Sequence, residues 1–248
     1  MTETFSNVYD DAHRARSYAG LEFPGTYYLA FRDLPALLRK HVRGTRALDF
    51  GCGAGRSTRF LRELAFDVVG VDVSQVMLDQ ARGHDPQGDY RLVADGAFAE
   101  FGAGTIDLAL AAFTFDNIPT DQKVTALREL RGLLAPGGRL VVVVSSPVIY
   151  CHEWASFSTE DYPANRRARD GDSVRIVMLD VPDRRPVVDV LCSDTHYRQL
   201  FEAVGLRVVD ALRPLATGAE PIQWVSETTI PPWTIYLLAA AENPWNGP

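Results

Sequence analysis

The segment 46–56 reads RALDFGCGAGR and combines an acidic residue with three alternating glycines. This pattern predicts an apolar strand that passes through a tight turn into a helix, which leaves unpaired backbone N–H groups facing a crevice. Gly51, Gly53 and Gly55 lack Cβ atoms, so a ligand can approach their backbone closely. Asp49 places a negative charge where a phosphate-binding turn would avoid one. We therefore expect a ligand whose near end is cationic, although an ordinary strand–turn–helix connection uses the same residue types.

Two further acidic residues follow the next two strand-like runs of the chain. Asp72 ends the run DVVGVD, and Asp95 ends the run YRLVAD. Carboxylates at these positions can accept hydrogen bonds from a ribose diol and from the exocyclic amine of a base. Met77, one turn into the helix that follows Asp72, could pack against that base. The structural alternatives are a helix cap, a turn residue and a core side chain, respectively. Together, at three consecutive strand ends, these residues favour an adenosine-binding crevice.

The elements that must position these residues alternate between strand-like and helix-like runs from Thr45 onward. This alternation is typical of βαβ units around a parallel sheet, so we expect a doubly wound α/β fold. Ser74 and Asp194 are expected to cap two helices, and Gly205 to end the second of them. The expected strands span 45–50, 67–72, 90–95, 106–115, 139–147, 206–215 and 234–241. The expected helices span 27–42, 55–64, 74–82, 120–134 and 195–205, and the first is bent or started at Pro35.

The composition bounds the class of protein. The chain has 248 residues, 46% of them hydrophobic and 23% charged, with a net charge of −7 and no long basic run. Nucleic acid is therefore disfavoured as the main partner, since phosphate neutralisation needs a basic surface. No stretch approaches the ~18 apolar residues of a membrane span, and no signal peptide is evident. Three widely spaced cysteines show no metal-ligand spacing, and their odd number indicates a reducing compartment. We expect a soluble cytoplasmic protein, either a monomer or a homodimer.

The motifs resemble those of the class I S-adenosylmethionine-dependent methyltransferases that act on small molecules. The matching pieces are LDFGCGAG, GVDVS, VADGAF, AAFTFDNIP and LRGLLAPGGRLVVV, which cover roughly residues 45–146, and TIYLLAAA resembles the family's last strand. The resemblance implies a doubly wound, Rossmann-like α/β sheet of seven strands, the last of them antiparallel, with helices on both faces. It also implies S-adenosyl-L-methionine as the cofactor and S-adenosyl-L-homocysteine as its product.

The resemblance also assigns parts of the cofactor to residues of this chain. A sulfonium is an activated methyl donor, so the enzyme mainly has to align the acceptor, and no metal or covalent nucleophile is needed. By resemblance, the methionine portion would contact Asp49, Gly51, Gly53 and Gly55; the ribose Asp72; the adenine Asp95 and Gly96; and the sulfonium region Ala112 and Phe113. Val73 and Met77 are further candidates for cofactor binding.

Within a single methyltransferase domain, we distinguish four parts by their patterns. An N-terminal helical lid (1–44) precedes the cofactor-binding core (45–147). An inserted cap (148–192) follows, in which the β-rich runs SVRIVMLDV and PVVDVLCS are separated by PDRR and a proline, as in a β-hairpin. The C-terminal part of the sheet (193–248) completes the chain.

The implied activity is methyl transfer to a small organic acceptor, with oxygen or nitrogen favoured over carbon. One alternative is an S-adenosylmethionine-binding module, or a non-methylating enzyme, on the same fold. A dinucleotide-dependent oxidoreductase is a further alternative, but it would carry GxGxxG after a neutral strand end. This chain has GxGxG after Asp49, which disfavours the oxidoreductase.

The acceptor would meet residues outside the cofactor motifs. Asp116 and Asn117 lie in FDNIP, where many relatives carry a histidine pair; either could position the acceptor or relay a proton, or cap the turn before Pro119. His152 is our candidate general base, because an imidazole can take a proton near neutral pH, although a loop histidine bonded to backbone is the alternative. The candidates for acceptor binding, each of which could instead be a core side chain, are Tyr18, Tyr28 and Trp154.

Overall fold

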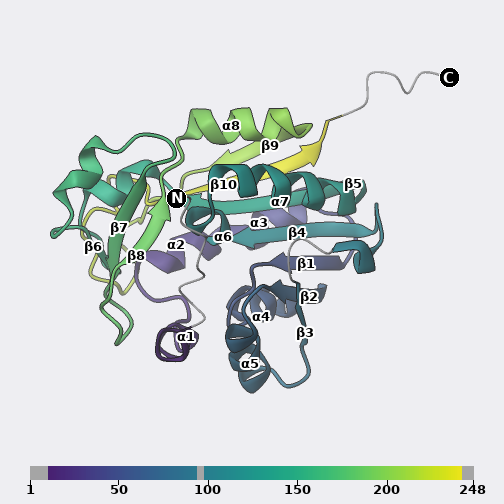
Figure 1. Cartoon of the computed structure of the whole chain (residues 1–248), viewed down its shortest axis with the longest axis horizontal. Coiled ribbons are helices and arrows are strands. Elements are labelled where there is room, and N and C mark those ends of the chain that lie inside the picture. Colours follow the sequence, from purple (N-terminus) through teal and green to yellow (C-terminus); the bar gives the residue numbers. More distant parts are fainter. Residues whose placement is uncertain (1–10, 94–97, 242–248) are drawn as a thin grey trace, which may run out of the picture.

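The computed structural model describes residues 11–93 and 98–241, and a seven-stranded sheet forms the centre of this part of the chain (Figure 1). The strands are β1 (Arg46–Phe50), β2 (Asp67–Asp72), β3 (Asp89–Leu92), β4 (Ile106–Ala112), β5 (Leu134–Ser145), β9 (Leu206–Leu212) and β10 (Trp233–Ala240). Their order in the sheet is β3-β2-β1-β4-β5-β10-β9. The first five strands of the chain pair in parallel, whereas β10 is antiparallel to both β5 and β9. The expected fold class is confirmed.

The strand order reverses at β1, which pairs with β2 on one side and with β4 on the other. In open α/β sheets a ligand crevice forms outside the carboxyl ends of the strands at such a reversal. Asp49, the fourth residue of β1, lies beside Gly70 of β2 and Leu110 of β4. The acidic residue and the glycine turn of the sequence pattern therefore lie at the reversal point of the sheet.

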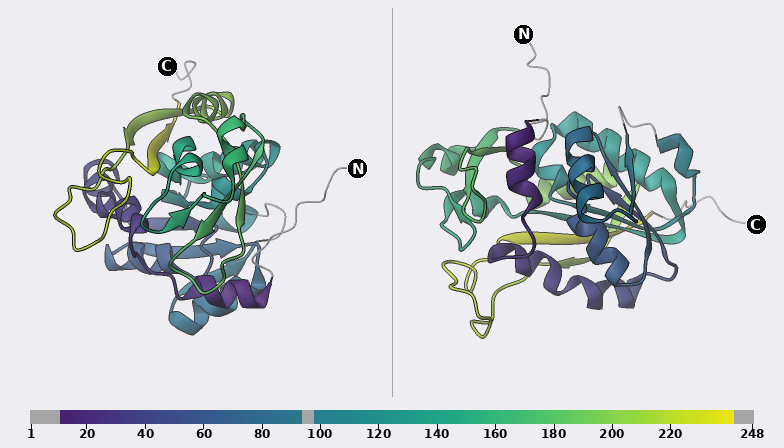
Figure 2. Two further views of the ribbon diagram at one scale, coloured as in Figure 1. Left: turned by 90° about the vertical axis from the view of Figure 1, so that its left-hand side faces the viewer. Right: turned by 90° about the horizontal axis from the view of Figure 1, so that it is seen from below.

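Helices cover both faces of the sheet (Figures 1 and 2). Val141 and Val143 of β5 belong to the core under α2 and α3, whereas Val142 and Val144 belong to the core under α7 and α8. A strand that is buried on both faces needs apolar residues at successive positions, which explains the run VVVV. None of the described helices is long and apolar enough to cross a lipid bilayer. The helices are α1 (Ala12–Ala19), α2 (Thr26–Arg32), α3 (Leu34–His41), α4 (Arg56–Glu63), α5 (Gln75–His84), α6 (Thr114–Asn117), α7 (Thr120–Leu133) and α8 (Asp194–Ala203).

The described N-terminal segment forms three helices, where the pattern predicted one over 27–42. Asp11 caps α1, because its carboxylate accepts the N–H groups of His13 at 3.0 Å and Arg14 at 2.9 Å. The predicted helix is divided at Asp33 into α2 and α3, with Pro35 in the first turn of α3, as expected. The additional helix, α1, lies alongside α5, as the right-hand view of Figure 2 shows.

The insertion between β5 and α8 carries the predicted hairpin at one end of the sheet (Figure 2). Its elements are η3 (Pro147–Cys151), β6 (Phe157–Ser158), η4 (Pro163–Arg167), β7 (Ser173–Met178) and β8 (Val187–Val190). β7 and β8 pair antiparallel, and β6 adds a third strand beside β7. The hairpin is thus part of a small second sheet.

A buried carboxylate, Glu227, joins three distant parts of the chain. Its side chain has no exposed surface. It accepts the Oγ1–H of Thr26 at 2.6 Å, the N–H of Ala155 at 2.8 Å and the N–H of Val225 at 2.9 Å. The start of α2, the insertion and the segment before β10 are therefore held by one side chain.

Several element boundaries differ from the prediction by a few residues, and three of the differences concern named residues. β4 ends at Ala112 because Phe113 adopts a left-handed conformation, with φ of 64°. β5 begins already at Leu134, before the proline and glycines that were expected to separate helix from strand. The predicted cap Asp194 is wrong by one residue: Ser193 has the extended conformation, and its Oγ accepts the N–H at the third helical position. Asp194 lies inside α8 and pairs with an arginine one turn later.

Candidate active site

The turn between β1 and α4 requires its glycines for two reasons. Gly51, Gly53 and Gly55 all have positive φ, between 53° and 82°. A Cβ at Gly51 would lie 2.3 Å from Oγ1 of Thr114, and one at Gly55 would lie 2.5 Å from the hydroxyl of Tyr90. The expectation that all three missing Cβ atoms make room for a ligand is therefore wrong at Gly51 and Gly55, where neighbouring side chains take that space.

Asp49 lies under this turn and is completely buried. Its Oδ2 accepts the hydroxyl hydrogens of Ser57 at 2.7 Å and Thr58 at 2.6 Å, whereas Oδ1 has no hydrogen-bond partner among the described residues. Burial raises the pKa of Asp49 to about 6. A buried carboxylate oxygen without a donor carries a desolvation cost that an N–H-bearing or cationic ligand would offset. The site thus fits the cationic ligand end expected from the sequence.

Asp72 joins the glycine turn to the next helix. Its Oδ2 accepts the N–H of Gly53 at 2.8 Å and its Oδ1 the N–H of Ser74 at 2.9 Å. Ser74 in turn caps α5 as expected, by accepting the N–H of Met77 at 3.5 Å. Asp72 is therefore not itself the cap of α5, but it has a structural role because it holds the glycine turn and the cap residue together. Each oxygen of an ionised carboxylate can accept more than one hydrogen bond.

The helix pair α1 and α5 flanks the same turn. Met77 is buried in a small cluster with Ala15, Ala19 and Ala54, and its Cε lies 3.2 Å from where a Cβ at Gly53 would be. Met77 is thus a core side chain, which was the structural alternative to packing against a base, and it lies next to the turn. Tyr18 packs against this cluster, whereas Val73 is 60% exposed at the end of β2. Asp95 and Gly96, the predicted adenine contacts, lie outside the described residues.

Aromatic rings form a wall beside the turn, at the end of β4. The ring of Phe113 lies 4.8 Å from that of Trp233 and 5.5 Å from that of Tyr27, centroid to centroid. Ala112, just before it, is half-buried against the same core. Tyr28 is also half-buried against this core, so nothing distinguishes it from a packing residue. The predicted sulfonium contacts therefore belong to a mainly apolar wall.

Asp116 and Asn117 do not cap the turn before Pro119 but tie the insertion to the sheet. Asp116 accepts the N–H of Ser145 at 3.1 Å and its Oγ–H at 2.9 Å. Asn117 donates to Oδ1 of Asp189, on β8, at 2.6 Å. Burial, and then the charge of Asp189, raise the pKa of Asp116 to about 8. Both candidate catalytic side chains are thus engaged in structural hydrogen bonds.

Asp189 extends this buried polar cluster in the insertion. Its Oδ2 accepts the hydroxyl of Tyr150 at 2.9 Å, and burial raises its pKa to about 6. The ammonium of Lys123, whose side chain is fully buried, lies 3.4 Å from the carbonyl oxygen of Val190. Burial lowers the pKa of Lys123. The sequence pointed to Asp116 and Asn117 but not to their partners Ser145, Tyr150, Lys123 and Asp189, because these lie in four other elements: β5, η3, α7 and β8.

His152 and Trp154 lie in the insertion and have different surroundings. His152 borders a hollow of about 510 Å³ that residues 150–166 alone line. Its ring packs edge-on to Trp154 at 6.2 Å between centroids. Trp154 is buried, and its Nε1–H donates to the carbonyl of Ile149 at 2.8 Å. Trp154 is therefore a core side chain, which was the structural alternative to acceptor binding. His152 therefore borders a space that none of the described residues of the glycine turn borders.

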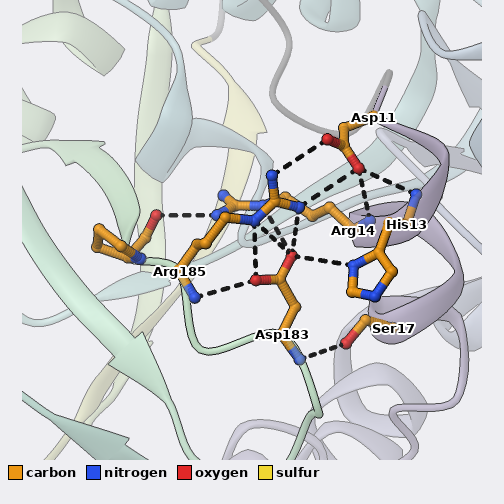
Figure 3. Close-up of polar contacts among 7 residues, drawn as sticks. Asp11, His13, Arg14, Ser17, Asp183 and Arg185 are labelled. Carbon is orange, nitrogen blue, oxygen red and sulfur yellow. Dashed lines mark hydrogen bonds and ion pairs between the residues drawn. The ribbon is translucent and has the colours of Figure 1, made fainter.

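A network of ion pairs, which the sequence did not indicate, connects α1 to the turn of the β7–β8 hairpin (Figure 3). Arg185 contacts Asp11 at 3.1 Å and Asp183 at 2.6 Å. Asp183, 5% exposed, lies 3.6 Å from Nε of Arg14, and its N–H donates to Oγ of Ser17 at 2.9 Å. We call these five residues the latch. It holds the N-terminal helix beside the glycine turn to the inserted hairpin.

The comparison with known proteins agrees with this geometry. Residues 48–142 match the family model described as a methyltransferase domain. An N-demethylindolmycin N-methyltransferase from Streptomyces griseus is 27% identical over 190 residues, which cover 75% of this chain and 79% of that protein. The chain matches only about half, or less, of the length of further curated relatives.

Solved structures of similar fold cover most of the chain. The CcbJ methyltransferase from Streptomyces caelestis has a TM-score of 0.64 at 19% identity, over 89% of this chain and all of that one. A 1,6-didemethyltoxoflavin-N1-methyltransferase from Burkholderia thailandensis, solved with S-adenosylhomocysteine and its substrate, has a TM-score of 0.57 at 18% identity, over 93% of this chain and 84% of that one. At these identities the likeness shows the fold.

Proposed function

Since this chain is an S-adenosylmethionine-dependent methyltransferase, we propose that it methylates a small organic acceptor, on oxygen or nitrogen in preference to carbon. One observation carries the proposal: Asp49 is buried at the reversal point of the sheet with one carboxylate oxygen lacking a donor. An ammonium group can supply that donor. The amino-acid end of the cofactor has such a group, and the glycine turn lies next to Asp49.

The chain's own residues have the task of binding and alignment. Asp49 and the turn would hold the methionine portion, and Asp72 the ribose, in addition to its bonds to Gly53 and Ser74. When bound, S-adenosylmethionine supplies a methyl group already activated on a sulfonium. The wall around Phe113 would keep water from that region, and an acceptor held in line with the reacting atom needs little further activation.

Several observations support a small acceptor over a macromolecule. The chain carries a net charge of −7, which disfavours a nucleic-acid surface. The latch ties α1 to the inserted hairpin next to the glycine turn, so the site is bordered by two segments rather than open to a large surface. The names of the similar proteins from Streptomyces griseus and Burkholderia thailandensis describe N-methylation of small molecules.

We propose His152 as the general base for acceptors that must lose a proton. Asp116 and Asn117 are engaged with Ser145 and Asp189, so they position the end of β5 and the hairpin. The imidazole of His152 borders a hollow in the insertion. A histidine there can accept a proton from a hydroxyl or ammonium group if the acceptor extends from the turn into the insertion.

Two measurements test the proposed function. Isothermal titration of the wild-type protein with S-adenosylhomocysteine should show binding, and Asp49→Asn should weaken it by about tenfold, since a charge-assisted hydrogen bond is lost. Incubation with methyl-labelled S-adenosylmethionine and a panel of phenols, amines and carboxylic acids should transfer label to an acceptor. Absence of S-adenosylhomocysteine binding at millimolar concentration would contradict the proposal.

A further inference from the structure

Arg56 is the first residue of α4 and directly follows the last glycine of the turn. Its side chain is only 8% exposed, which is rare for a charged residue unless it is paired. The guanidinium is therefore a buried cation immediately beside the proposed cofactor site. The sequence analysis attached no role to it.

Five aromatic rings surround this guanidinium. The distance from its central carbon to the ring centroid is shortest for Tyr27, at 4.8 Å. The ring faces attract a cation electrostatically, and an enclosed cation gains more from them than an exposed one. A guanidinium is planar and has five N–H donors, whereas the faces of these rings contain no conventional hydrogen-bond acceptor atoms. The other four rings, at 5.6 to 5.8 Å, belong to Tyr18, Phe23, Phe31 and Phe113.

Arg56 forms no ion pair with any acidic side chain in the described part of the chain. Its Nη1 donates to the backbone carbonyl of Glu22 at 2.6 Å, and its Nη2 to the hydroxyl of Tyr18 at 3.4 Å. The carboxylate of Glu22 is turned to Arg59 instead, at 2.6 Å. Asp49 is close enough for the charge of Arg56 to act on its carboxylate, but the two side chains form neither a hydrogen bond nor an ion pair within 4 Å.

A buried guanidinium whose hydrogen-bond partners are all neutral, and which has N–H groups left over, matches a planar anion that accepts two parallel hydrogen bonds. We propose that Arg56 is the carboxylate-binding residue of this site. The assignment builds on the proposed function, because it places the anion next to the cofactor turn. The orphaned Oδ1 of Asp49 and the guanidinium of Arg56 then present opposite charges to one bound small molecule.

Two bound molecules could supply that carboxylate. One is the cofactor, through its amino-acid end, and the other is an acceptor that is itself a carboxylic acid. The first arm of the test separates them by titrating S-adenosylhomocysteine and 5′-methylthioadenosine, which lacks the amino-acid end, into wild-type protein and Arg56→Met. The second arm titrates benzoate and its neutral analogue benzamide into the same proteins saturated with S-adenosylhomocysteine.

A control variant separates the role of Arg56 from general damage to α4. Arg62→Met removes another arginine of the same helix, which pairs with Asp85 at the surface. Thermal unfolding and circular dichroism of both variants show whether they are folded. Arg56→Lys keeps the charge but removes the planar fork, so partial recovery in Arg56→Lys indicates that charge and geometry both contribute.

The outcomes either support or overturn the assignment. A loss of about 10- to 100-fold in S-adenosylhomocysteine affinity in Arg56→Met, with 5′-methylthioadenosine binding unchanged, supports it and identifies the cofactor as the source. Unchanged S-adenosylhomocysteine affinity with loss of a benzoate-over-benzamide preference supports it and identifies the acceptor. If a folded Arg56→Met changes neither, Arg56 is a packing residue and the assignment is wrong. Failure of the wild-type protein to bind S-adenosylhomocysteine would instead refute the proposed function.

Discussion

The carboxylate of Asp72 accepts the backbone N–H of Gly53 at 2.8 Å, which attaches the middle of the glycine turn to the end of β2. Its other oxygen accepts the N–H of Ser74 at the start of α5. One side chain therefore fixes the relative position of two adjacent strand ends. Any ligand that spans the two strand ends meets a turn that is already held in place, which reduces the ordering cost of binding.

Asp72→Ala should both destabilise the protein and remove cofactor binding. The N–H groups of Gly53 and Ser74 lose their acceptor, which costs about 1–3 kcal/mol where they are buried. We expect S-adenosylhomocysteine affinity to fall by at least about tenfold in isothermal titration. Ser74→Ala is the control, because it removes a helix cap worth about 1 kcal/mol without touching the carboxylate. If Asp72→Ala retains full affinity, the ribose assignment is wrong.

The affinity for S-adenosylhomocysteine should depend on the ionisation of Asp49. Burial raises its pKa to about 6, so the charged form that attracts an ammonium exists mainly above that pH. Affinity should rise by up to about tenfold per pH unit between pH 5 and 6 and level off above pH 7. Titrations at fixed ionic strength measure this profile. Asp49→Asn should bind more weakly with a flat profile, and an equally steep profile in the variant would assign the titration to another group.

Removal of the Arg185 ion pairs of the latch should increase the rate at which α1 opens to solvent. Arg185→Met removes the contacts to Asp11 and Asp183, and exposed ion pairs contribute little to the stability of the whole fold. We expect hydrogen exchange across residues 12–19 to accelerate by up to about fivefold, with little change in Tm. Hydrogen bonds from Arg185 lower the pKa of Asp11 to about 2 and hold that of Asp183 below its usual range.

The sign of these pKa changes sets the pH range of the latch. A carboxyl group with a depressed pKa in the folded state contributes stability above its unfolded pKa, near 4, and loses it as the pH falls further. Protection of α1 should therefore be constant from pH 5 to 8 and decrease below pH 4. Asp180→Asn, at an acidic residue near the hairpin turn but outside the latch, is the control. Equal exchange in wild type and Arg185→Met would show that apolar packing alone holds α1.

Asp116→Asn should raise the free energy of unfolding relative to wild type, and the difference should grow as the pH rises toward 8. Burial raises the pKa of Asp116 to about 8, so the native state holds a proton that the unfolded chain releases above pH 4. Wild-type stability therefore falls as the pH rises from 4 to 8, whereas an amide removes this dependence and still accepts from Ser145. We expect the variant to gain at least about 1 kcal/mol over wild type between pH 5 and 8 in urea unfolding. A constant difference across this range would contradict the prediction.

His152→Ala should reduce kcat by about 10²- to 10³-fold if His152 is the general base, with little effect on S-adenosylhomocysteine binding. The pH profile of label transfer should lose its acidic limb, and added imidazole should restore part of the rate. His84→Ala, a change at another histidine on the outside of α5, is the control. An unchanged pH profile in His152→Ala would assign the proton transfer to a different group.

The cofactor half of the site could be predicted from the sequence because it is built from local patterns. A strand, a glycine turn and a helix follow one another within residues 46–63, and the acid at each strand end is brought to the crevice by the parallel sheet itself. The alternation of runs therefore determined both the fold class and the positions of Asp49 and Asp72. Even here, the sequence carried a further signal in Arg56, since a charged residue directly after the glycine turn lies at the proposed cofactor site.

The acceptor half could not be predicted in the same way. Asp116 has Ser145 as its partner, and Asn117 has Asp189, 72 positions further along the chain. Arg185 and Asp11 of the latch are separated by 174 positions. Such contacts depend on how the insertion and the N-terminal helices pack over the sheet, and no spacing rule in a single sequence encodes that packing. For the same reason Trp154 was a candidate for acceptor binding, whereas its side chain is buried in the core.

The shared carboxylate of Glu227 limits how this enzyme can be re-engineered. A graft that replaced residues 148–192 with the corresponding loop of another enzyme would discard the N–H of Ala155, while Glu227 and Thr26 stayed behind. An enclosed charge that loses a donor is strongly destabilising. Attempts to alter the acceptor range by loop exchange should therefore transfer these three positions together. A library of point substitutions that leaves them unchanged carries less risk of unfolding the protein.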